Sequence, residues 1–269
     1  MEKLPSMSVE AGGFGKNRNL ILGDPKKAKM IVGAHYDTCA VLPYPNLITP
    51  KNIPFYILYN LLILAPMIAL FVVFFKTMNV LFYFLGLGYA VAMSIIMRFG
   101  VPNRHTANDN TSGVIALCEL WESLSEEEKE KVALVFFDNE ENGLLGSKFY
   151  RKMHKDEISR QLMINLDCIS DGDYLMVISS RTAKELYGEP VDAAFASNDE
   201  KTVVHESSKS TIYPSDQASF PNHVAVAAMK KNRLIGYYLD KIHTKNDVNF
   251  DERNIELITS GIKNIINKI

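Results

Sequence analysis

The sequence has little cysteine and almost no excess charge. Only three of its 269 residues are cysteine, Cys39, Cys118 and Cys168. Their odd number and irregular spacing exclude a disulfide framework and indicate free thiols in a reducing compartment. The 29 basic and 31 acidic residues leave a net charge of −2, and there is no basic stripe, so we expect no nucleic-acid partner. Residues 1–16 are polar and glycine-rich and lack the apolar core of a secretory signal.

Charge is nearly absent from one long stretch of the chain. Between Ile53 and Met97 the only charged residue is Lys76, which leaves two uncharged runs at 53–75 and 77–97. Each run exceeds the roughly 18 apolar residues that suggest a membrane-spanning helix. Residues 51–98 are therefore predicted to form a transmembrane helical hairpin, with the lipid bilayer as partner of residues 53–97. The alternatives are a very apolar soluble core, and a flap that dips into one leaflet or caps an apolar pocket.

The charges around this stretch predict its orientation. Lys51, Arg98 and Arg104 flank its open end, whereas Lys76 is expected at the turn. The positive-inside tendency then favours the cytosolic side for the domain that flanks this stretch. Small residues at helical spacing are expected to let the two helices approach closely at similar depth; they are Ala65 and Ala69 in the first run and Gly86, Ala90 and Ser94 in the second.

Outside the hairpin, short apolar runs alternate with segments of helical periodicity. Strands are predicted at 29–34, 132–137, 161–166, 174–178, 202–205 and 224–228, and helices at 113–124, 144–154, 182–196 and 253–268. This alternation predicts an α/β fold, a three-layer sandwich in which a mostly parallel mixed sheet is covered by helices on both faces. The main domain is then discontinuous and comprises residues 1–50 and 99–269.

Several predicted strands end in side chains that bind metals. Reactive groups commonly lie at the carboxyl ends of strands in open α/β sheets, and imidazole together with carboxylate suits zinc. Taken singly, each residue also has an ordinary explanation, such as a surface histidine, a helix cap or a turn residue. The candidates are His35 and Asp37 after the first strand, Glu140 and Glu141 after 132–137, Asp167 after 161–166, and Asp109 and His243 in loops.

The His-x-Asp spacing at the first strand carries its own expectation. Residues i and i+2 of an extended segment share one face. Asp37 is therefore expected to lie beside His35, accept the distal N–H of its imidazole and fix the orientation of the ring.

Five motifs occur in an order that resembles the co-catalytic zinc exopeptidases, a family that includes bacterial leucyl aminopeptidases, glutamate carboxypeptidase II and the glutaminyl cyclases. The resemblance spans about residues 29–269, interrupted by the apolar insert, and the glutamate pair followed by Gly-Leu-x-Gly-Ser is its most specific part. The motifs are His35-Tyr36-Asp37, Asn108-Asp109-Asn110-Thr111-Ser112-Gly113, Asp138-Asn139-Glu140-Glu141-Asn142-Gly143-Leu144-Leu145-Gly146-Ser147, Asn165-Leu166-Asp167 and Ile242-His243-Thr244.

The resemblance implies two zinc ions and a role for each matching residue. Asp109 would bridge the two ions, with His35 and Asp167 completing one site and Glu141 and His243 completing the other. Glu140 would be the general base that activates water, and Asp37 would orient His35. The implied activity is zinc-dependent hydrolysis of N-terminal residues from peptide substrates by a membrane-anchored aminopeptidase.

The sequence departs from the family pattern in three places. The segment 215–220 resembles the family's Ser-Asp-His-x-x-Phe near the substrate, but Gln217 replaces the histidine. Family members usually have a longer segment, including a helix, before the strand that carries His-x-Asp, whereas only about one strand is expected there in this sequence. The apolar insert lies between His35 and Asp109, where soluble relatives have a short loop. Substrate contacts are expected from Tyr213, Ser215, Asp216 and Gln217.

Two other functions are compatible with these motifs. One is glutaminyl cyclase-like acyl transfer on a single zinc, and the other is a catalytically inactive binding module on the same fold. Zinc content per chain distinguishes the three functions, since they require two ions, one ion and none. The remaining histidines are not expected to be ligands; they are His105, His154, His205 and His223.

Overall fold

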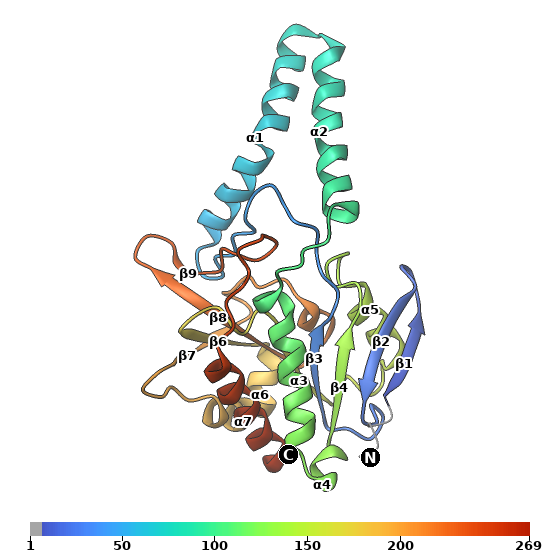
Figure 1. Cartoon of the computed structure of the whole chain (residues 1–269), viewed down its shortest axis with the longest axis vertical. Coiled ribbons are helices and arrows are strands. Elements are labelled where there is room, and N and C mark those ends of the chain that lie inside the picture. The colour runs from blue at the N-terminus through green and yellow to red at the C-terminus, as the bar shows by residue number, and fades with distance from the viewer. Residues whose placement is uncertain (1–6) are drawn as a thin grey trace.

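The computed structural model describes residues 7–269 (Figure 1). The predicted domain 1–50 thus begins with six residues that lie outside the described part. A nine-stranded mixed sheet has the order β1-β2-β4-β3-β5-β8-β6-β7, and β9 pairs with β8. Its strands are β1 Ser8–Gly12, β2 Asn17–Leu22, β3 Met30–His35, β4 Val132–Phe137, β5 Leu162–Leu166, β6 Tyr174–Ser179, β7 Thr202–Ser207, β8 His223–Asn232 and β9 Gly236–Tyr238.

The centre of the sheet is parallel and its flanks are not. Strands β4, β3, β5 and β8 run in one direction, whereas β2 and β6 are antiparallel to their neighbours β4 and β8. Every residue of β3, β4 and β5 is buried, as continuous apolar runs in parallel strands predict. The carboxyl ends of these three strands therefore meet at one edge of the sheet.

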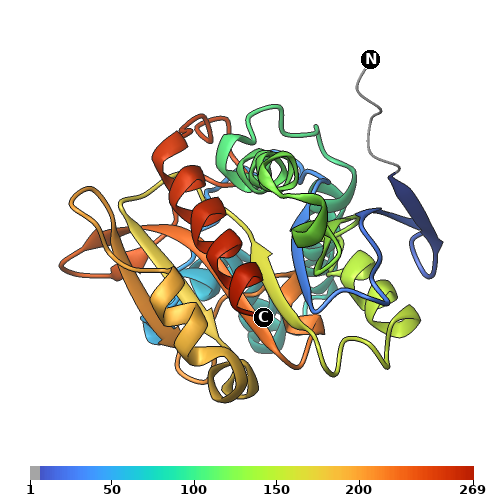
Figure 2. The same ribbon diagram turned by 90° about the horizontal axis from the view of Figure 1, so that it is seen from below.

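Helices cover both faces, which confirms the predicted α/β sandwich. Helices α3, α6 and α7 pack on one face through a core that includes Leu117, Val191 and Ile262. Helix α5 and the short η2 cover the other, where the rings of Phe137 and Tyr150 lie 5.8 Å apart, edge to face. Figure 2 shows α3 and α7 on the opposite side of the sheet from α5. The helices are α3 Ser112–Ser123, α4 Glu126–Lys129, α5 Leu145–Met153, α6 Arg181–Ala194, α7 Glu252–Lys268 and the 3-10 turn η2 Asp216–Ser219.

The structure adds elements that the apolar pattern does not reveal. Two strands, β1 and β2, precede His35 where one was expected, and they form an antiparallel hairpin at the edge of the sheet. Strand β1 is only partly covered, with the sequence Ser-Val-Glu-Ala-Gly, so it lacks the apolar run by which the other strands were predicted. The charged connector before β4 contains the short helix α4, whose N-terminus is capped by a capping box of Ser125 and Glu128.

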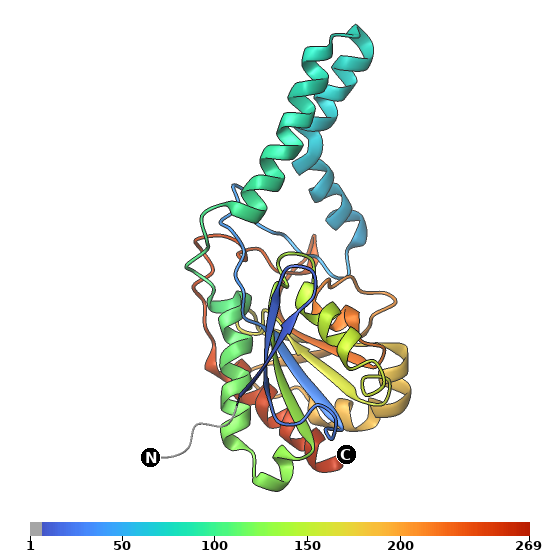
Figure 3. The same ribbon diagram turned by 90° about the vertical axis from the view of Figure 1, so that its right-hand side faces the viewer.

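The apolar stretch forms two long antiparallel helices, α1 Ile53–Thr77 and α2 Val80–Phe99, that project from the body (Figures 1 and 3). The most apolar window of α1 has no buried residue, and that of α2 is 6% buried. These helices are therefore not part of a soluble apolar core. Both are long and apolar enough to cross a membrane.

The turn between these helices lies where it was predicted. Lys76 lies in the last turn of α1, two residues before Met78, whose left-handed conformation ends the helix, and Asn79 caps α2. One of the predicted small residues faces an aromatic ring of the other helix. Gly86 faces the ring of Phe71, whose nearest atom would lie 3.1 Å from an added Cβ, so this glycine makes room for an aromatic ring.

Replacing Gly146 by alanine is expected to destabilise the domain, because Gly146 lies where α5 touches the end of β4. An added Cβ would lie 2.1 Å from the carbonyl oxygen of Asp138, and backbone cannot move as a flexible side chain can. Overpacking of this kind costs about 1–3 kcal/mol, which thermal unfolding of detergent-solubilised protein will measure. Gly188→Ala in α6 is the matched control, since its added Cβ meets only the side chain of Lys184, at 3.1 Å. Equal melting temperatures for the two variants would contradict the prediction.

Candidate metal centre

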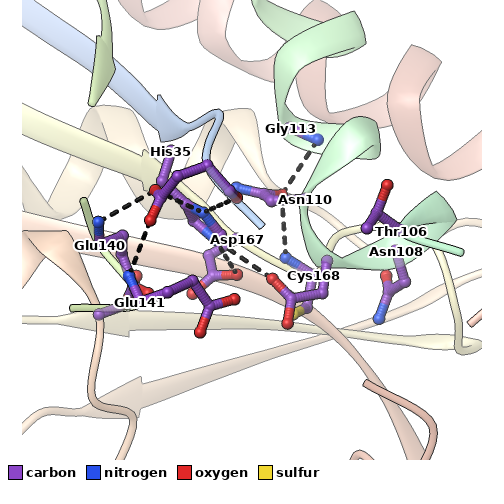
Figure 4. A network of polar contacts seen from close by, with 12 residues as sticks. His35, Thr106, Asn108, Asn110, Gly113, Glu140, Glu141, Asp167 and Cys168 are labelled. Atoms are coloured by element: carbon purple, nitrogen blue, oxygen red, sulfur yellow. Dashed lines mark hydrogen bonds and ion pairs between the residues drawn. The ribbon is translucent and has the colours of Figure 1, made fainter. Parts of the chain in front are cut away.

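Parallel strands bring four of the predicted site residues to one edge of the sheet. His35 is the last residue of β3, Glu140 and Glu141 follow β4, and Asp167 follows β5. Because β3 pairs in parallel with both β4 and β5, these side chains converge although more than one hundred residues separate the first from the last. Figure 4 shows them pointing toward one another.

Asp109 reaches the same place from the irregular segment Ala107–Thr111 that precedes α3. Its φ and ψ of −113° and 91° are not helical, and its peptide bond to Asn110 is cis. The carboxylate of Asp247 accepts the backbone N–H groups of Asn108 at 2.8 Å and of Asp109 at 2.9 Å. The side chain of Asn110 donates to the carbonyl of Leu166 at 2.9 Å. The Asp109 loop is thus held between β5 and the loop that carries Asp247.

The two oxygens of Asp109 face two separate groups of ligands. On one side, Oδ1 lies 3.2 Å from Nε2 of His35, and the same nitrogen lies 3.6 Å from Oδ1 of Asp167. On the other side, Oδ2 lies 3.1 Å from Nε2 of His243, which lies 3.2 Å from Oε2 of Glu141. One carboxylate therefore stands between two imidazole–carboxylate pairs.

The chemistry of these groups fits divalent zinc. Ligand atoms of His35, Asp109 and Asp167 lie within 4.8 Å of one another, as do those of Cys39, Glu141 and His243. Oδ1 of Asp167 and Oε1 of Glu141 are buried and have no hydrogen-bond partner among the described residues. A buried carboxylate oxygen without a partner is costly unless a cation or donor satisfies it. Zinc accepts imidazole nitrogen and carboxylate oxygen together.

Burial and proximity shift the pKa values of these groups in opposite directions. Burial disfavours protonation of His35 and His243, but Asp109 together with Asp167 and Asp37 around His35, and with Cys39 and Glu141 around His243, outweighs it and raises both pKa values well above the ordinary range. Burial opposes the charge of Asp109, yet its contacts with the two imidazoles lower its pKa. The cluster therefore stabilises positive charge between its carboxylates.

The two neighbouring glutamates differ in their surroundings. Burial raises the pKa of Glu140 well above its ordinary value; the imidazole of His35 opposes this shift, and the nearby carboxylates of Asp216 and Asp167 add to it. Burial also raises the pKa of Glu141, but the imidazole of His243 opposes that shift. Both glutamates group with His35, but only Glu141 lies within ion-pair distance of an imidazole, 3.2 Å from Nε2 of His243, and Glu140 is a buried carboxyl group with a raised affinity for a proton.

Asp37 lies beside His35 as the His-x-Asp spacing predicts, but the ring hydrogen-bonds to its backbone carbonyl, and its carboxylate makes contacts that the spacing did not show. Its carboxylate accepts the backbone N–H groups of Glu140 at 3.0 Å and of Glu141 at 3.2 Å. Nδ1 of His35 lies 3.5 Å from the Asp37 carboxylate and 3.2 Å from the Asp37 carbonyl oxygen. Asp37 is therefore in contact with the predicted ligands of both halves of the centre.

The predicted substrate segment lies beside the centre but hydrogen-bonds within the protein. The amide of Asn165 donates to Oγ of Ser215 at 2.9 Å and to Oε1 of Gln217 at 3.0 Å. Gln217 donates in turn to the carbonyl of Tyr213 at 2.6 Å. Gln217 occupies the family's histidine position as a buried structural amide. Burial raises the pKa of Asp216 to about 7, and neither of its oxygens has a described partner.

Tyr213 connects this segment to the metal ligands. Its hydroxyl donates to the backbone carbonyl of Asp167 at 2.9 Å, and its side chain is buried. The segment therefore supports Asp167 through its backbone carbonyl. The four residues predicted to contact the substrate are all buried.

Two residues near the centre were not predicted from the sequence. Cys39 groups with Glu141 and His243, and burial raises the pKa of its thiol to about 11. Asp247 holds the Asp109 loop, as described above. Their only local signal is proximity in sequence, since Cys39 follows Asp37 by two residues and Asp247 follows His243 by four.

The other histidines lie apart from the ligand groups. His105 is exposed, and His154 pairs with Glu10 at 2.7 Å. His205 contacts the carbonyl of Phe195 at 2.8 Å, and Nδ1 of His223 contacts that of Phe220 at 2.7 Å. None of these four belongs to a metal-type cluster within residues 7–269.

An α/β sheet that presents two imidazole–carboxylate pairs around a shared aspartate is the arrangement of the co-catalytic zinc exopeptidases. The sequence model of peptidase family M28 matches residues 91–263, which is well over half of the chain. The protein therefore belongs to peptidase family M28, and the resemblance deduced from the motifs is confirmed. No curated protein sequence matches the chain.

Solved structures share the fold at low sequence identity. The glutaminyl cyclase of Porphyromonas gingivalis superposes with a TM-score of 0.61 and 14% identity, covering 98% of this chain and 84% of its own. A Zn-dependent exopeptidase from Parabacteroides distasonis gives 0.58 and 14%, covering 97% and 82%. The LapA aminopeptidase of Legionella pneumophila gives 0.55 and 13% over 97% of this chain. The chain spans 58% of the length of that aminopeptidase, and these likenesses show the fold alone.

Proposed function

We propose that the protein is a membrane-anchored, zinc-dependent aminopeptidase that binds two zinc ions. The observation that carries this proposal is Asp109, whose two oxygens face His35 on one side and His243 on the other. His35 and Asp167 would hold the first ion with Asp109, and Glu141 and His243 would hold the second. A glutaminyl cyclase with a single zinc ion would need only one of these two imidazole–carboxylate pairs.

The residues of the chain suit hydrolysis of a peptide bond. When bound, zinc polarises a carbonyl group and makes water more acidic at neutral pH. Glu140 would accept the proton of the attacking water and then give it to the leaving amine, for which its raised pKa is suited. Asp37 fixes the backbone of Glu140 through the N–H bond at 3.0 Å. Tyr213, Ser215, Asp216 and Gln217 would support the substrate site from within the protein, since Tyr213 donates to the carbonyl of Asp167 at 2.9 Å.

The test is hydrolysis of a panel of aminoacyl chromogenic substrates and N-terminal glutaminyl peptides by the detergent-solubilised full chain, with and without a chelator. We expect release of the first residue, loss of activity on chelation and recovery with zinc. Glu140→Gln is the control for a contaminating peptidase. Cyclisation of glutaminyl peptides without hydrolysis would replace the aminopeptidase proposal with acyl transfer, and protein that holds no zinc and converts no substrate would support a binding module.

The anchor we propose is the pair α1 and α2, which would cross the bilayer as a hairpin. The 25 residues of α1 extend over about 37 Å at about 1.5 Å per residue, which exceeds a bilayer core of about 30 Å. Both ends of the hairpin return to the same edge of the sheet, so His35 and Asp109 remain in one domain. Lys51, Arg98 and Arg104 at the open end favour a cytosolic catalytic domain.

Labelling of a cysteine at position 77 will test this topology. In membranes, Thr77→Cys in a Cys118→Ser background is expected to react only from the side opposite the catalytic domain, and carbonate is expected to leave the protein in the pellet. Native Cys118, which is exposed on α3, is the control for the catalytic side. Extraction by carbonate, or labelling of positions 77 and 118 from the same side, would exclude the spanning hairpin.

A further inference from the structure

Three projections leave the catalytic domain at the edge that carries the metal centre. The α1–α2 hairpin follows β3. Strand β2 is antiparallel to β4, which places the turn between β1 and β2 at the carboxyl end of β4. Strand β8 is parallel to β5, which places the turn between β8 and β9 at the carboxyl end of β5. Figures 1 and 3 show both turns level with the base of the helical hairpin.

Each of these two turns displays one large apolar side chain. Phe14 in the β1–β2 turn is 82% exposed, and Leu234 in the β8–β9 turn is 88% exposed. At the base of the hairpin, Phe99 and Val101 are 75% and 76% exposed. A single exposed apolar residue is ordinary on a soluble protein, but these lie on one side of the molecule around an apolar hairpin.

The turns hold these side chains outward by their own backbone. Gly13 and Gly15 flank Phe14 with φ values of 74° and 90°, which favour glycine over other residues. The side chain of Asn17 donates to the carbonyl of Phe14 at 3.0 Å. In the other turn, the N–H of Leu234 donates to Oδ1 of Asn232 at 2.7 Å. The exposure of Phe14 and Leu234 is therefore built into ordered turns.

Cations accompany the apolar tips. Within residues 7–269, no carboxylate is within ion-pair distance of five basic residues at this edge, namely Lys16, Arg98, Arg104, Lys231 and Arg233. Nζ of Lys231 lies over the rings of Tyr174 and Tyr237, at 5.3 and 4.8 Å. Apolar tips beside cations and tyrosines are the composition that inserts into the headgroup layer of anionic membranes. Acidic groups share the edge, but Asp171 and Asp240 are paired with Lys230, each at 2.7 Å.

From this arrangement we infer that the catalytic domain docks its active-site edge on an anionic lipid surface through the β1–β2 and β8–β9 turns. The inference rests on the membrane anchoring proposed above, and it adds two contact points that fix the orientation of the domain. Backbone bonds connect the base of the hairpin to the metal centre, since Leu42 N–H donates to the carbonyl of His243 at 3.0 Å and Asn103 N–H to that of Cys39 at 2.9 Å. The metal centre then faces the headgroup layer.

Tryptophan scanning of the full chain, reconstituted into phosphatidylcholine–phosphatidylserine vesicles with acyl chains brominated near the headgroup, will test the docking. Phe14→Trp and Leu234→Trp are expected to show quenched, blue-shifted emission relative to the wild type, whose single tryptophan, Trp121, supplies the baseline. Leu186→Trp is the matched negative control, because Leu186 is 64% exposed but lies on α6, away from this edge. Ile68→Trp, halfway along α1, reports whether the hairpin is in the bilayer when deeper brominated lipids are used.

These variants separate the failure of docking from the failure of the anchor. Quenching at Ile68→Trp without quenching at Phe14→Trp and Leu234→Trp would overturn docking and leave the hairpin in the membrane. Absence of quenching at Ile68→Trp would overturn both. Equal quenching at Leu186→Trp would indicate general adsorption of the protein to the vesicle. An emission change that depends on protein density and not on bromine would indicate that the turns contact a second copy of the chain. Either result would overturn docking.

The charge requirement has a separate test in the same vesicles. The double variant Lys231→Glu and Arg233→Glu is expected to remove the quenching of Leu234→Trp on anionic vesicles, while Phe14→Trp in the same background stays quenched. Replacing Lys152 and Lys268 by glutamate is the control for net charge, because these lysines lie in the last turns of α5 and α7, away from this edge. If the double variant and this control lose quenching equally, local recognition of headgroups by the β8–β9 turn is wrong.

Discussion

Replacing Asp109 by alanine is expected to remove both zinc ions from the protein and to abolish hydrolysis. Its two oxygens lie 3.2 and 3.1 Å from the ring nitrogens of His35 and His243, so one substitution takes a ligand from each half of the centre. The loss of a residue that only supports a ligand typically costs about 10- to 100-fold in metal affinity. The loss of a ligand shared by two ions should exceed that range.

Elemental analysis of the purified, detergent-solubilised protein will measure this effect. We expect about two zinc ions per wild-type chain and almost none in Asp109→Ala. Glu119→Ala is a matched control, because it removes an exposed carboxylate from α3, the helix that follows Asp109. Retention of one ion by Asp109→Ala would show that the two halves bind independently, and retention of both would exclude the bridging role.

The parts of this centre that a sequence can reveal are those encoded by short, contiguous patterns. The strand Val132–Phe137 was predicted with the bounds that the structure shows, because its uninterrupted apolar run ends at charged residues on both sides. The same logic placed β3 to within one residue at each end and located the carboxyl end of β5 at Leu166. Since the carboxyl ends of parallel strands share one edge, the convergence of His35, Glu141 and Asp167 followed from the pattern.

Contacts that depend on the order of the strands in the sheet could not be predicted from the sequence. Asp37 binds the backbone of Glu140 and Glu141, about one hundred residues away, because β3 lies beside β4 in the sheet. Asp247 binds the backbone of Asp109 from a loop on the far side of the centre. No periodicity marks either partner, so these contacts become visible only once the strands are ordered.

The last prediction concerns Glu140, whose replacement by glutamine is expected to leave zinc bound and lower kcat by about 10²- to 10⁴-fold, the range typical of general acid–base catalysis. Glutamine keeps the shape of the side chain and the backbone N–H that Asp37 accepts at 3.0 Å. What it removes is the carboxylate that takes the proton. Because Glu140 is not within ion-pair distance of His35, His243 or another described cation, its loss should spare the ligand groups.

Glu141→Gln is the matched control, since it makes the same chemical change one residue along the chain. Oε2 of Glu141 lies 3.2 Å from Nε2 of His243, and its other oxygen is buried without a described partner. This variant should lose zinc affinity, and excess zinc should restore part of its turnover, whereas excess zinc should not rescue Glu140→Gln. Zinc titrations and steady-state kinetics on both variants measure the two effects separately. If Glu140→Gln loses zinc and Glu141→Gln keeps it, the roles of the two glutamates are the reverse of those proposed, because only the residue that holds the ion can respond to its concentration.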